Sequence, residues 1–274
     1  MVRPALQAVG WRLEDASVTA FVGTSGWVYR SWRGRFYPAD AHPGRWLELY
    51  ARAFATVEVN ATFYRLPPTT MVEGWAKRTP ADFRFAAKMS RLVTHVRRLG
   101  EVGPAIETFL TTMAPLGPKL GPILLQLPPG LEAAPALRDA ALRCFPPGQR
   151  VACEFRHDSW FAGETYRVLE RHDAALCLAD RDGEAVAPLV RTARWGYARF
   201  HAGRGDPYPA YAAGELERWA DELVRLFPEG DLYLYFNNDP FACAPRDACV
   251  LADALRARGL PVTRTPSTDS IRVG

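Results

Sequence analysis

The sequence predicts a single-domain (β/α)8 barrel of the TIM type. Within its 274 residues, eight short apolar or alternating runs are separated by stretches in which apolar residues recur about every 3.6 positions. Strands that alternate with helices are joined by crossovers and run parallel, and eight such units are typical of a barrel of roughly 250 residues. The rival architecture is a doubly wound open sheet, but no GxGxxG phosphate turn follows the first run.

The expected elements follow one another regularly along the chain. The strands are residues 21–27, 56–64, 83–89, 121–129, 150–157, 174–180, 196–203 and 231–239. Helices are expected after the first five strands and after the last two, at residues 45–54, 69–78, 105–116, 136–145, 164–173, 215–227 and 248–259. Segment 183–194 would form the helix between the sixth and seventh strands, and its helical pattern is the weakest.

The barrel is expected to occupy residues 21–262, between an extension at residues 1–20 and a polar, frayed tail at residues 263–274. The start of the chain lacks a signal-peptide pattern, and no later stretch approaches the roughly 18 apolar residues of a membrane span. The five cysteines form no CxxC pair and lie mostly among apolar neighbours, so reduced thiols are expected. These features predict a cytoplasmic protein without a membrane segment.

Polar side chains close six of the eight expected strands. In TIM-type barrels the carboxyl ends of the strands carry the active site, whereas polar groups at the other end more often serve stability. Side chains two positions apart on a strand share a face. Three such pairs and four single residues lie at the expected strand ends: Glu58 with Asn60, Glu154 with Arg156, Arg199 with His201, and Lys88, Gln126, Asn237 and Asn238.

Buried charges are costly unless they are paired, hydrogen-bonded or used in chemistry. One interpretation of these strand ends is a substrate pocket. The other is a satisfied polar network without a substrate, in which Glu154 bridges to Arg156 or Arg199 while Gln126 and Asn60 complete hydrogen bonds. Convergence of so many polar groups at one end favours the pocket, and the network stays open as an alternative.

The segment EFRHDSW, residues 154–160, shows how one strand end would serve such a pocket. Glu154 and Arg156 should face the barrel mouth, while Phe155 packs toward the helices. His157 lies next to the face of that pair and should point outward or cap the turn. Asp158 or Ser159 is expected to cap the helix that follows.

Seven segments closely resemble, in order, the signature segments of the domain-of-unknown-function 72 family, the YecE-like proteins. They are GTSGWVYRSWRGRFYP, FATVEVNATFYRLPP, FRFAAKMSRLVTH, LLQLPP, EFRHDSW, ARFHAG and YFNND, and they run from about Gly23 to about Asn238. The resemblance implies a TIM-type barrel, a cytoplasmic location and no established activity. It also marks characteristic positions, none of them with a catalytic role to transfer: Glu58, Asn60, Lys88, His95, Gln126, Glu154, Arg156, Arg199, His201 and Asn237, with the aromatic residues Trp27, Tyr29, Trp32, Tyr37, Phe63, Tyr64 and Trp160.

These residue types suit metal-free acid–base chemistry. Glu154 would be the general base or acid and His201 its proton-transfer partner, with Lys88 and Glu58 as further catalytic candidates. Lys88, Arg156 and Arg199 would also clamp an anion. Further substrate contacts would come from Asn60, Gln126, Asn237, Tyr29, Trp27 and Tyr64. We therefore predict an enzyme that catalyses hydrolysis, elimination or isomerisation of a small anionic or polyhydroxylated molecule.

No cofactor is predicted, but a divalent metal stays open because Glu58, Glu154, His157 and His201 are acceptable ligand types. The signal is weak, since no closely spaced set such as HExxH is present. A glycosidase would use Glu58 and Glu154 as its carboxylate pair, yet strands two and five lie well apart in an eight-stranded ring. Ser25 is not in a GxSxG elbow, which argues against a serine nucleophile.

Two other classes of function remain as alternatives. A nucleic-acid-processing enzyme would stack bases on the aromatic rings and touch phosphates with Arg30, Arg33 and Arg35. The formal charge of only +4, with basic residues spread among acidic ones, supports this weakly. A non-catalytic ligand sensor or scaffold would bind a metabolite without turning it over. Salt-sensitive retention on single-stranded DNA would favour the first, and a bound but unconverted metabolite the second.

Overall fold

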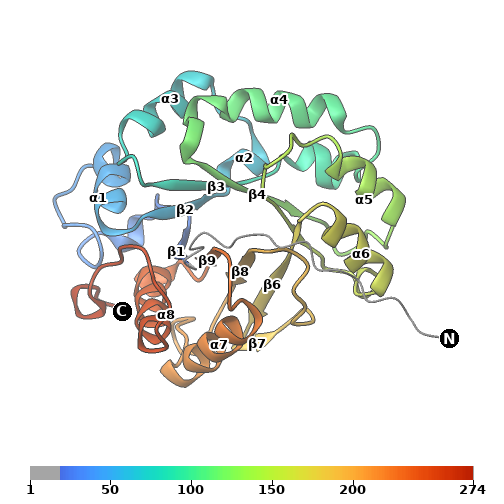
Figure 1. Ribbon diagram of the computed structural model, residues 1–274. Helices are drawn as coiled ribbons and strands as arrows, with labels where there is room; N and C mark the ends of the chain where they lie inside the picture. The colour runs from blue at the N-terminus through green and yellow to red at the C-terminus, as the bar shows by residue number, and fades with distance from the viewer. Residues whose placement is uncertain (1–18, 274) are drawn as a thin grey trace, which may run out of the picture.

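Eight parallel strands close into a ring with helices around it in the computed structural model, which describes residues 19–273 (Figure 1). The pairing order is β5-β4-β3-β2-β1-β9-β8-β6, and β5 pairs with β6 to complete the barrel. The strands of the ring are β1 Ala20–Ser25, β2 Thr56–Val59, β3 Arg84–Lys88, β4 Leu120–Gln126, β5 Val151–Glu154, β6 Ala175–Arg181, β8 Gly196–Phe200 and β9 Leu232–Phe236. The predicted (β/α)8 barrel is therefore confirmed.

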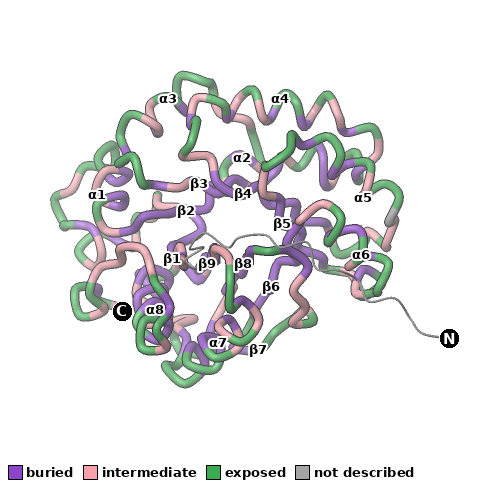
Figure 2. Tube along the Cα trace, viewed as in Figure 1, coloured by how far each residue is buried: buried purple, intermediate pink, exposed green. Residues whose placement is uncertain are grey.

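The helices pack outside the ring and bury one face against it (Figure 2). They are α1 Trp46–Ala53, α2 Ala61–Tyr64, α3 Thr69–Lys77, α4 Gly103–Met113, α5 Pro135–Leu142, α6 Gly163–Arg171, α7 Ala213–Leu226 and α8 Cys243–Ala257. The strands are coloured as buried in Figure 2, whereas much of the outward surface of α3 and α4 is exposed. No helix in the described part of the chain is long and apolar enough to span a membrane.

Segment 183–194 does not form the expected helix. It begins with a short strand, β7 Glu184–Ala185, which pairs antiparallel with the end of β6. The turn between them contains Asp182 and Gly183, both with positive φ, 56° and 72°. An Asp-Gly pair in this conformation favours a tight hairpin, and this local signal outweighs the weak helical pattern.

Several strands end earlier than predicted. The second strand stops at Val59, and residues 61–64 form the one-turn helix α2 instead of continuing the strand. The fifth strand stops at Glu154, so Arg156 extends from the loop that follows it. Apolar alternation persists beyond both points, but the ladder of hydrogen bonds to the neighbouring strands ends there.

The C-terminal tail is packed rather than frayed. Thr263 N donates to Ala20 O at 2.9 Å, and the Arg264 guanidinium donates to Ala51 O on α1. Further along, Ile271 is only 6% exposed. The polar residues of the tail add side-chain contacts, since Arg264 pairs with Asp82 and Thr268 Oγ1 donates to Asp253 Oδ2 at 3.2 Å. The expected N-terminal extension lies, for residues 1–18, outside the described residues.

Candidate active site

The inward-facing side chains of the barrel change character toward the carboxyl ends of the strands. Lower in the barrel they form an apolar and aromatic cluster that includes Ala86, Leu124, Ala152, Cys177, Tyr197 and Tyr235. Closer to the carboxyl ends, two residues further along β3, β4, β5 and β8, the inward-facing side chains are polar. They are Ser25, Glu58, Lys88, Gln126, Glu154 and Arg199. This polar layer lies where barrels of this type carry their active sites.

Arg199, on β8, is the centre of the polar layer. Its guanidinium donates to Glu58 Oε1 from Nε at 3.2 Å and from Nη2 at 3.0 Å, and to Glu154 Oε2 from Nη1 at 2.6 Å. A longer bond of 3.3 Å runs from Nη1 to Gln126 Oε1. Arg199 and both carboxylates are at most 2% exposed. Burial opposes the charge of Arg199, but the two carboxylates outweigh it and hold the pKa well above its usual value.

Both oxygens of Glu58 already accept hydrogen bonds, and the side chain is fully buried. Besides Arg199, it accepts from Ser25 Oγ at 2.6 Å on Oε1 and from Tyr197 OH at 2.5 Å on Oε2. Ser25, excluded above as a nucleophile, and Tyr197, which sequence reasoning missed, are therefore donors to this carboxylate. Glu58 and Glu154 share one guanidinium, so they do not form the free carboxylate pair of a glycosidase. Glu58 acts by holding Arg199 in place.

Glu154, on β5, keeps one partly open oxygen. Its Oε1 accepts from Arg156 Nε at 3.1 Å and lies 3.6 Å from His201 Nε2, too far for a hydrogen bond. Burial acts to raise the pKa of Glu154, but Arg199, His201 and Arg156 outweigh it and hold the pKa well below its usual value. Glu154 is therefore ionised at neutral pH and suited to accepting a hydrogen bond, whereas so low a pKa makes it a weak proton acceptor.

The first cavity, of about 660 Å³, opens above the polar layer. It is lined by Tyr29, Asn60, Phe63, Tyr64, Lys88, Arg91, His95, Gln126, Arg156, Arg199 and Asn237. Four of these residues are lysine or arginine, and none is a carboxylate. Such a lining attracts an anion. The cavity thus gathers the three residues of the expected anion clamp and five of the six further substrate contacts; the exception is Trp27, whose ring packs edge-on against Trp75 of α3.

Lys88 ends β3 and lines the first cavity. Its Nζ donates to Gln126 Oε1 at 2.8 Å and lies 4.3 Å from the centroid of the Phe63 ring. Burial, reinforced by Arg199, lowers the pKa of Lys88 to about 8, against the opposing effect of Glu58 and Glu154. A lysine in this range exchanges its proton near neutral pH, as a general acid or base must.

The second cavity, of about 330 Å³, lies beside the first. Its lining is Pro129, Glu154, Phe155, Arg156, Asp158, Phe161, Ala179, Arg181, Val186 and His201. The predicted pair Glu154 and His201 therefore faces a different cavity from Lys88, and Arg156 lines both. Sequence reasoning placed all these groups in one pocket and did not separate the two.

The other residues of EFRHDSW shape the chain around the second cavity, which Phe155 and Asp158 also line. Phe155 stacks on Trp160 at 4.8 Å between centroids, toward the helices as expected. His157, not Asp158 or Ser159, caps the short helical turn that follows, because its Nδ1 accepts from Ser159 N at 3.3 Å. The helix α6 begins later, at Gly163, without a side-chain cap. The histidine can act as a cap because its Nδ1 reaches the backbone amide of Ser159, two residues further along the chain.

Most aromatic residues and arginines after β1 contact their own loop or neighbouring segments and do not line the first cavity, Tyr29 excepted. Trp32 is buried, with its indole Nε1 donating to Asp239 O at 2.8 Å, and Tyr37 donates to Trp27 O at 2.7 Å. Arg33 and Arg35, two of the arginines expected to touch phosphates, donate to backbone carbonyls of this loop. Neither they nor Arg30 line the first cavity. Nucleic-acid processing therefore stays a prediction that the placement of these arginines does not favour.

Two residues of the mouth were missed. Arg91, which lines the first cavity, lies just past β3 in the quoted segment FRFAAKMSRLVTH, and a cation so close to a strand end could have been counted. Asp239 follows β9; burial raises its pKa to about 7, and its Oδ1 has no hydrogen-bond partner among the described residues. Within residues 19–273, no three His, Cys, Asp or Glu side chains are grouped so that they could hold a metal.

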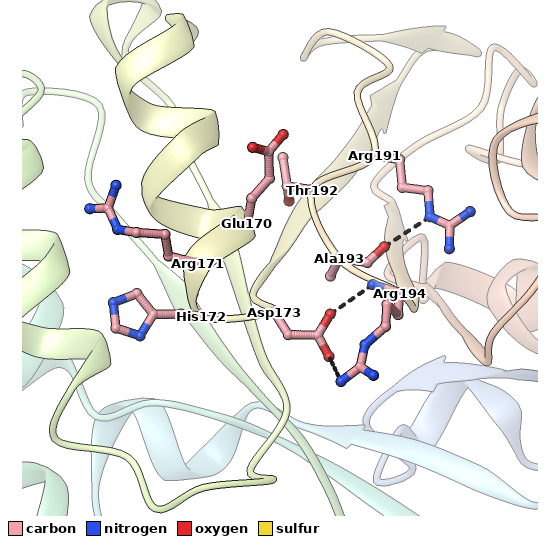
Figure 3. Close-up of a pocket in the computed structure, with 8 residues that line it drawn as sticks. All are labelled: Glu170, Arg171, His172, Asp173, Arg191, Thr192, Ala193 and Arg194. Carbon is pink, nitrogen blue, oxygen red and sulfur yellow. Dashed lines mark hydrogen bonds and ion pairs between the residues drawn. The ribbon is translucent and has the colours of Figure 1, made fainter. Parts of the chain in front are cut away.

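A pocket of about 610 Å³ lies at the opposite end of the barrel (Figure 3). It is formed by residues 170–173 and 191–194, which precede β6 and β8. Asp173 binds Arg194, and Figure 3 shows Arg171 and His172 pointing away from Arg191 and Arg194. Its charged groups do not converge, so we assign it to the stability face of the barrel.

Fold and mouth together define a TIM-type barrel protein whose cation-lined cavity opens at the carboxyl ends of the strands. The family model described as "Protein of unknown function DUF72" matches residues 21–270. The chain belongs to this family, which confirms the resemblance drawn from the sequence.

Relatives and a solved structure agree with this assignment. The chain is 38% identical over 144 residues to "UPF0759 protein YecE" of Escherichia coli, a match that covers 49% of this chain and 52% of that protein. It is 26% identical to "UPF0759 protein YunF" of Bacillus subtilis, over 80% of this chain and 88% of that one. The crystal structure of a DUF72 family protein from Thermotoga maritima superimposes with a TM-score of 0.76 at 27% identity, covering 87% of this chain and 99% of that one.

Proposed function

We propose that this protein is an enzyme that acts on a small anionic molecule at the carboxyl end of its barrel, with Lys88 as the proton-transfer group. The observation that carries the proposal is the lining of the first cavity, which has four cationic side chains and no carboxylate. A negatively charged substrate would be drawn there and oriented by several donors. Hydrolysis, elimination and isomerisation all remain within the proposal, because each needs a proton carrier.

The roles of the acidic residues follow from their contacts. Glu154, held ionised by Arg199, is proposed as a hydrogen-bond acceptor that orients the substrate, with His201 beside it. Glu58 is proposed as a positioning residue, because its oxygens already accept from Arg199, Ser25 and Tyr197. Arg199 and Arg156 would stabilise negative charge that develops on the substrate.

A cytoplasmic location is part of the proposal. All five cysteines are free, and four of them are buried. Thiols that stay unpaired are typical of a reducing compartment.

The test is turnover of a panel of phosphorylated and carboxylated metabolites by wild type and by Lys88→Met. Removal of a positioned proton carrier should lower kcat by about 10²–10⁴-fold. If Lys88 is the general base, kcat/KM should rise with pH and level off above about 8, because only the neutral amine accepts a proton.

Lys77→Met is the matched control, since Lys77 ends α3 and lines neither cavity. It should leave kcat unchanged. Full activity in Lys88→Met would refute the assigned role. Binding across the panel without any turnover would instead favour the non-catalytic ligand sensor.

A further inference from the structure

The two cavities share Arg156 in their linings, and other residues of the first cavity contact residues of the second. Arg199, which lines the first cavity, binds Glu154 of the second at 2.6 Å. Asn237 of the first cavity lies 3.4 Å from His201 of the second, measured between Asn237 Nδ2 and His201 Nδ1. One ligand that spans Arg156 would therefore meet both sets of groups.

His201 carries an unused hydrogen-bonding atom in the second cavity. Its side chain is 9% exposed, and Nε2 is buried without a hydrogen-bond partner among the described residues. Because the amide nitrogen of Asn237 faces Nδ1, Nδ1 is the acceptor and Nε2 carries the proton. A buried donor without an acceptor is costly, so a ligand that supplies one is favoured.

The acceptor that fits is a hydroxyl group. His201 Nε2 and Glu154 Oε1 are 3.6 Å apart, too far for a direct hydrogen bond. A single hydroxyl offers one proton and two lone pairs, so it can accept from Nε2 and donate to Oε1 at once. For this the His201 ring must turn slightly, because two hydrogen bonds of about 2.8 Å at a near-tetrahedral angle span about 4.5 Å, more than the 3.6 Å between the two atoms. An anion in this place would have no proton to donate to the ionised Glu154 Oε1.

The rest of the second cavity combines apolar surface with a balanced set of charges. Pro129, Phe161, Ala179 and Val186 are apolar, and the two cations of the lining, Arg156 and Arg181, equal its two carboxylates, Glu154 and Asp158, in number. A cavity without net charge suits an uncharged carbon skeleton. Sugars and polyols combine hydroxyl groups with apolar C–H surface, and apolar and aromatic side chains pack against the latter.

The charge balance of the first cavity matches a dianion. Its four cationic side chains, Lys88, Arg91, Arg156 and Arg199, stand against the two carboxylates that bind Arg199 and Arg156, which are Glu58 and Glu154. Two positive charges remain uncompensated among these six groups. A phosphate monoester carries between about one and a half and two negative charges at neutral pH.

We propose that the substrate is a phosphate monoester of a small hydroxylated molecule, with its phosphate in the first cavity and a hydroxyl held between His201 and Glu154 in the second. This inference rests on the proposed function, which requires only an anion. It specifies that the anionic group is a phosphate and that the substrate carries a hydroxyl. It also assigns the second cavity to the recognition of the uncharged part of the substrate.

Calorimetric titration of the full chain tests it with four probes: inorganic phosphate, glycerol 3-phosphate, ribose 5-phosphate and glucose 6-phosphate. At least one ester should bind wild type tenfold or more tightly than inorganic phosphate does. In His201→Ala this advantage should fall to about twofold or less, while the affinity for inorganic phosphate stays unchanged. Lys88→Met should weaken the binding of phosphate and ester alike.

A second variant guards against misfolding of His201→Ala. Val186 is 53% exposed at the edge of the second cavity, so Val186→Trp should narrow that cavity without disturbing the core. It should abolish the advantage of the ester. Met71→Trp, at an exposed position of α3 that lines neither cavity, is the control and should bind as wild type does.

The outcomes separate the two proposals. If inorganic phosphate binds in a Lys88-dependent way but no ester binds more tightly, this inference is wrong and the proposed anion site stands. The same holds if His201→Ala weakens phosphate and ester equally. If wild type binds neither inorganic phosphate nor any ester, the inference fails, and the proposed function then depends on the carboxylates of the turnover panel.

Discussion

Arg199 is the one cation that two buried carboxylates share. Glu58 and Glu154 reach the mouth from β2 and β5, and both accept from this one guanidinium. Removing a buried charge leaves its partners uncompensated in a medium that solvates them poorly, which is more costly than the intact pair is favourable. The residue that sequence reasoning counted among the substrate clamps is also the main structural ion of the barrel.

Replacing Arg199 by methionine should therefore destabilise the protein strongly. We expect the free energy of unfolding to fall by about 3–5 kcal/mol, because Glu58 and Glu154 lose their shared partner. Chemical denaturation in urea measures this. Arg156→Met is the matched control: its side chain is 35% exposed and makes one ion pair, so the loss should stay within about 1 kcal/mol. Equal losses in the two variants would contradict the assignment.

The elements whose ends were mispredicted share one physical cause. The sequences of residues 61–64 and of the start of segment 183–194 are compatible with both a strand and a helix. At these places a turn or the end of the hydrogen-bonded ladder decides, and both act over only a few residues. The tail was mispredicted for a related reason: its polar residues find partners far away in the chain, such as Asp82 for Arg264.

Ile271 should anchor the C-terminal tail. Its side chain is almost fully buried, so Ile271→Ala should lower the free energy of unfolding by about 2 kcal/mol through lost apolar burial. Urea denaturation tests this against Val96→Ala, whose parent side chain is 61% exposed and whose effect should be under about 0.5 kcal/mol. A tail that frays in solution would make the two variants indistinguishable.

At the scale of the whole molecule, the polar layer links strands from different parts of the ring. Hydrogen bonds join Ser25 of β1, Glu58 of β2 and Arg199 of β8, and Arg199 continues to Gln126 of β4 and Glu154 of β5. Contacts this distant in sequence form only when the barrel closes. The ionisation of the layer should therefore be coupled to global unfolding.

Acid unfolding should report this coupling through Glu154. Its pKa in the folded protein is well below the unfolded value of about 4.5, so below that pH the unfolded chain binds a proton that the native protein does not. Stability should therefore fall with decreasing pH, by up to about 1.4 kcal/mol per pH unit from this group alone. Glu154→Gln, although less stable at neutral pH, should show a slope shallower by that amount.

The control for this measurement is Glu107→Gln, at an exposed position of α4. Its stability should follow the wild-type curve between pH 2 and 5. Parallel curves for wild type and Glu154→Gln would mean that Glu154 is not held ionised by the layer. Unfolding free energies at a series of pH values provide the comparison.

The sequence by itself determined the architecture and the end of the barrel that carries the polar groups. Periods of 2 and 3.6 depend only on local backbone geometry, and eight alternating units leave few ways to pack. The same period of two placed Glu58, Lys88, Gln126 and Arg199 at one end, since parallel strands bring their carboxyl ends together.

Only the tertiary structure decided what those groups do. It showed that Glu58 is saturated by donors, that Lys88 faces a cavity of cations, and that Glu154 and His201 line a second cavity. Hydrogen-bond partners, burial and pKa values depend on residues far apart in the chain. Tyr197, for example, donates a hydrogen bond to Glu58, and Arg199 helps to lower the pKa of Lys88. No local pattern encodes these contacts, because they arise from ring closure and from the register of each strand against its neighbours.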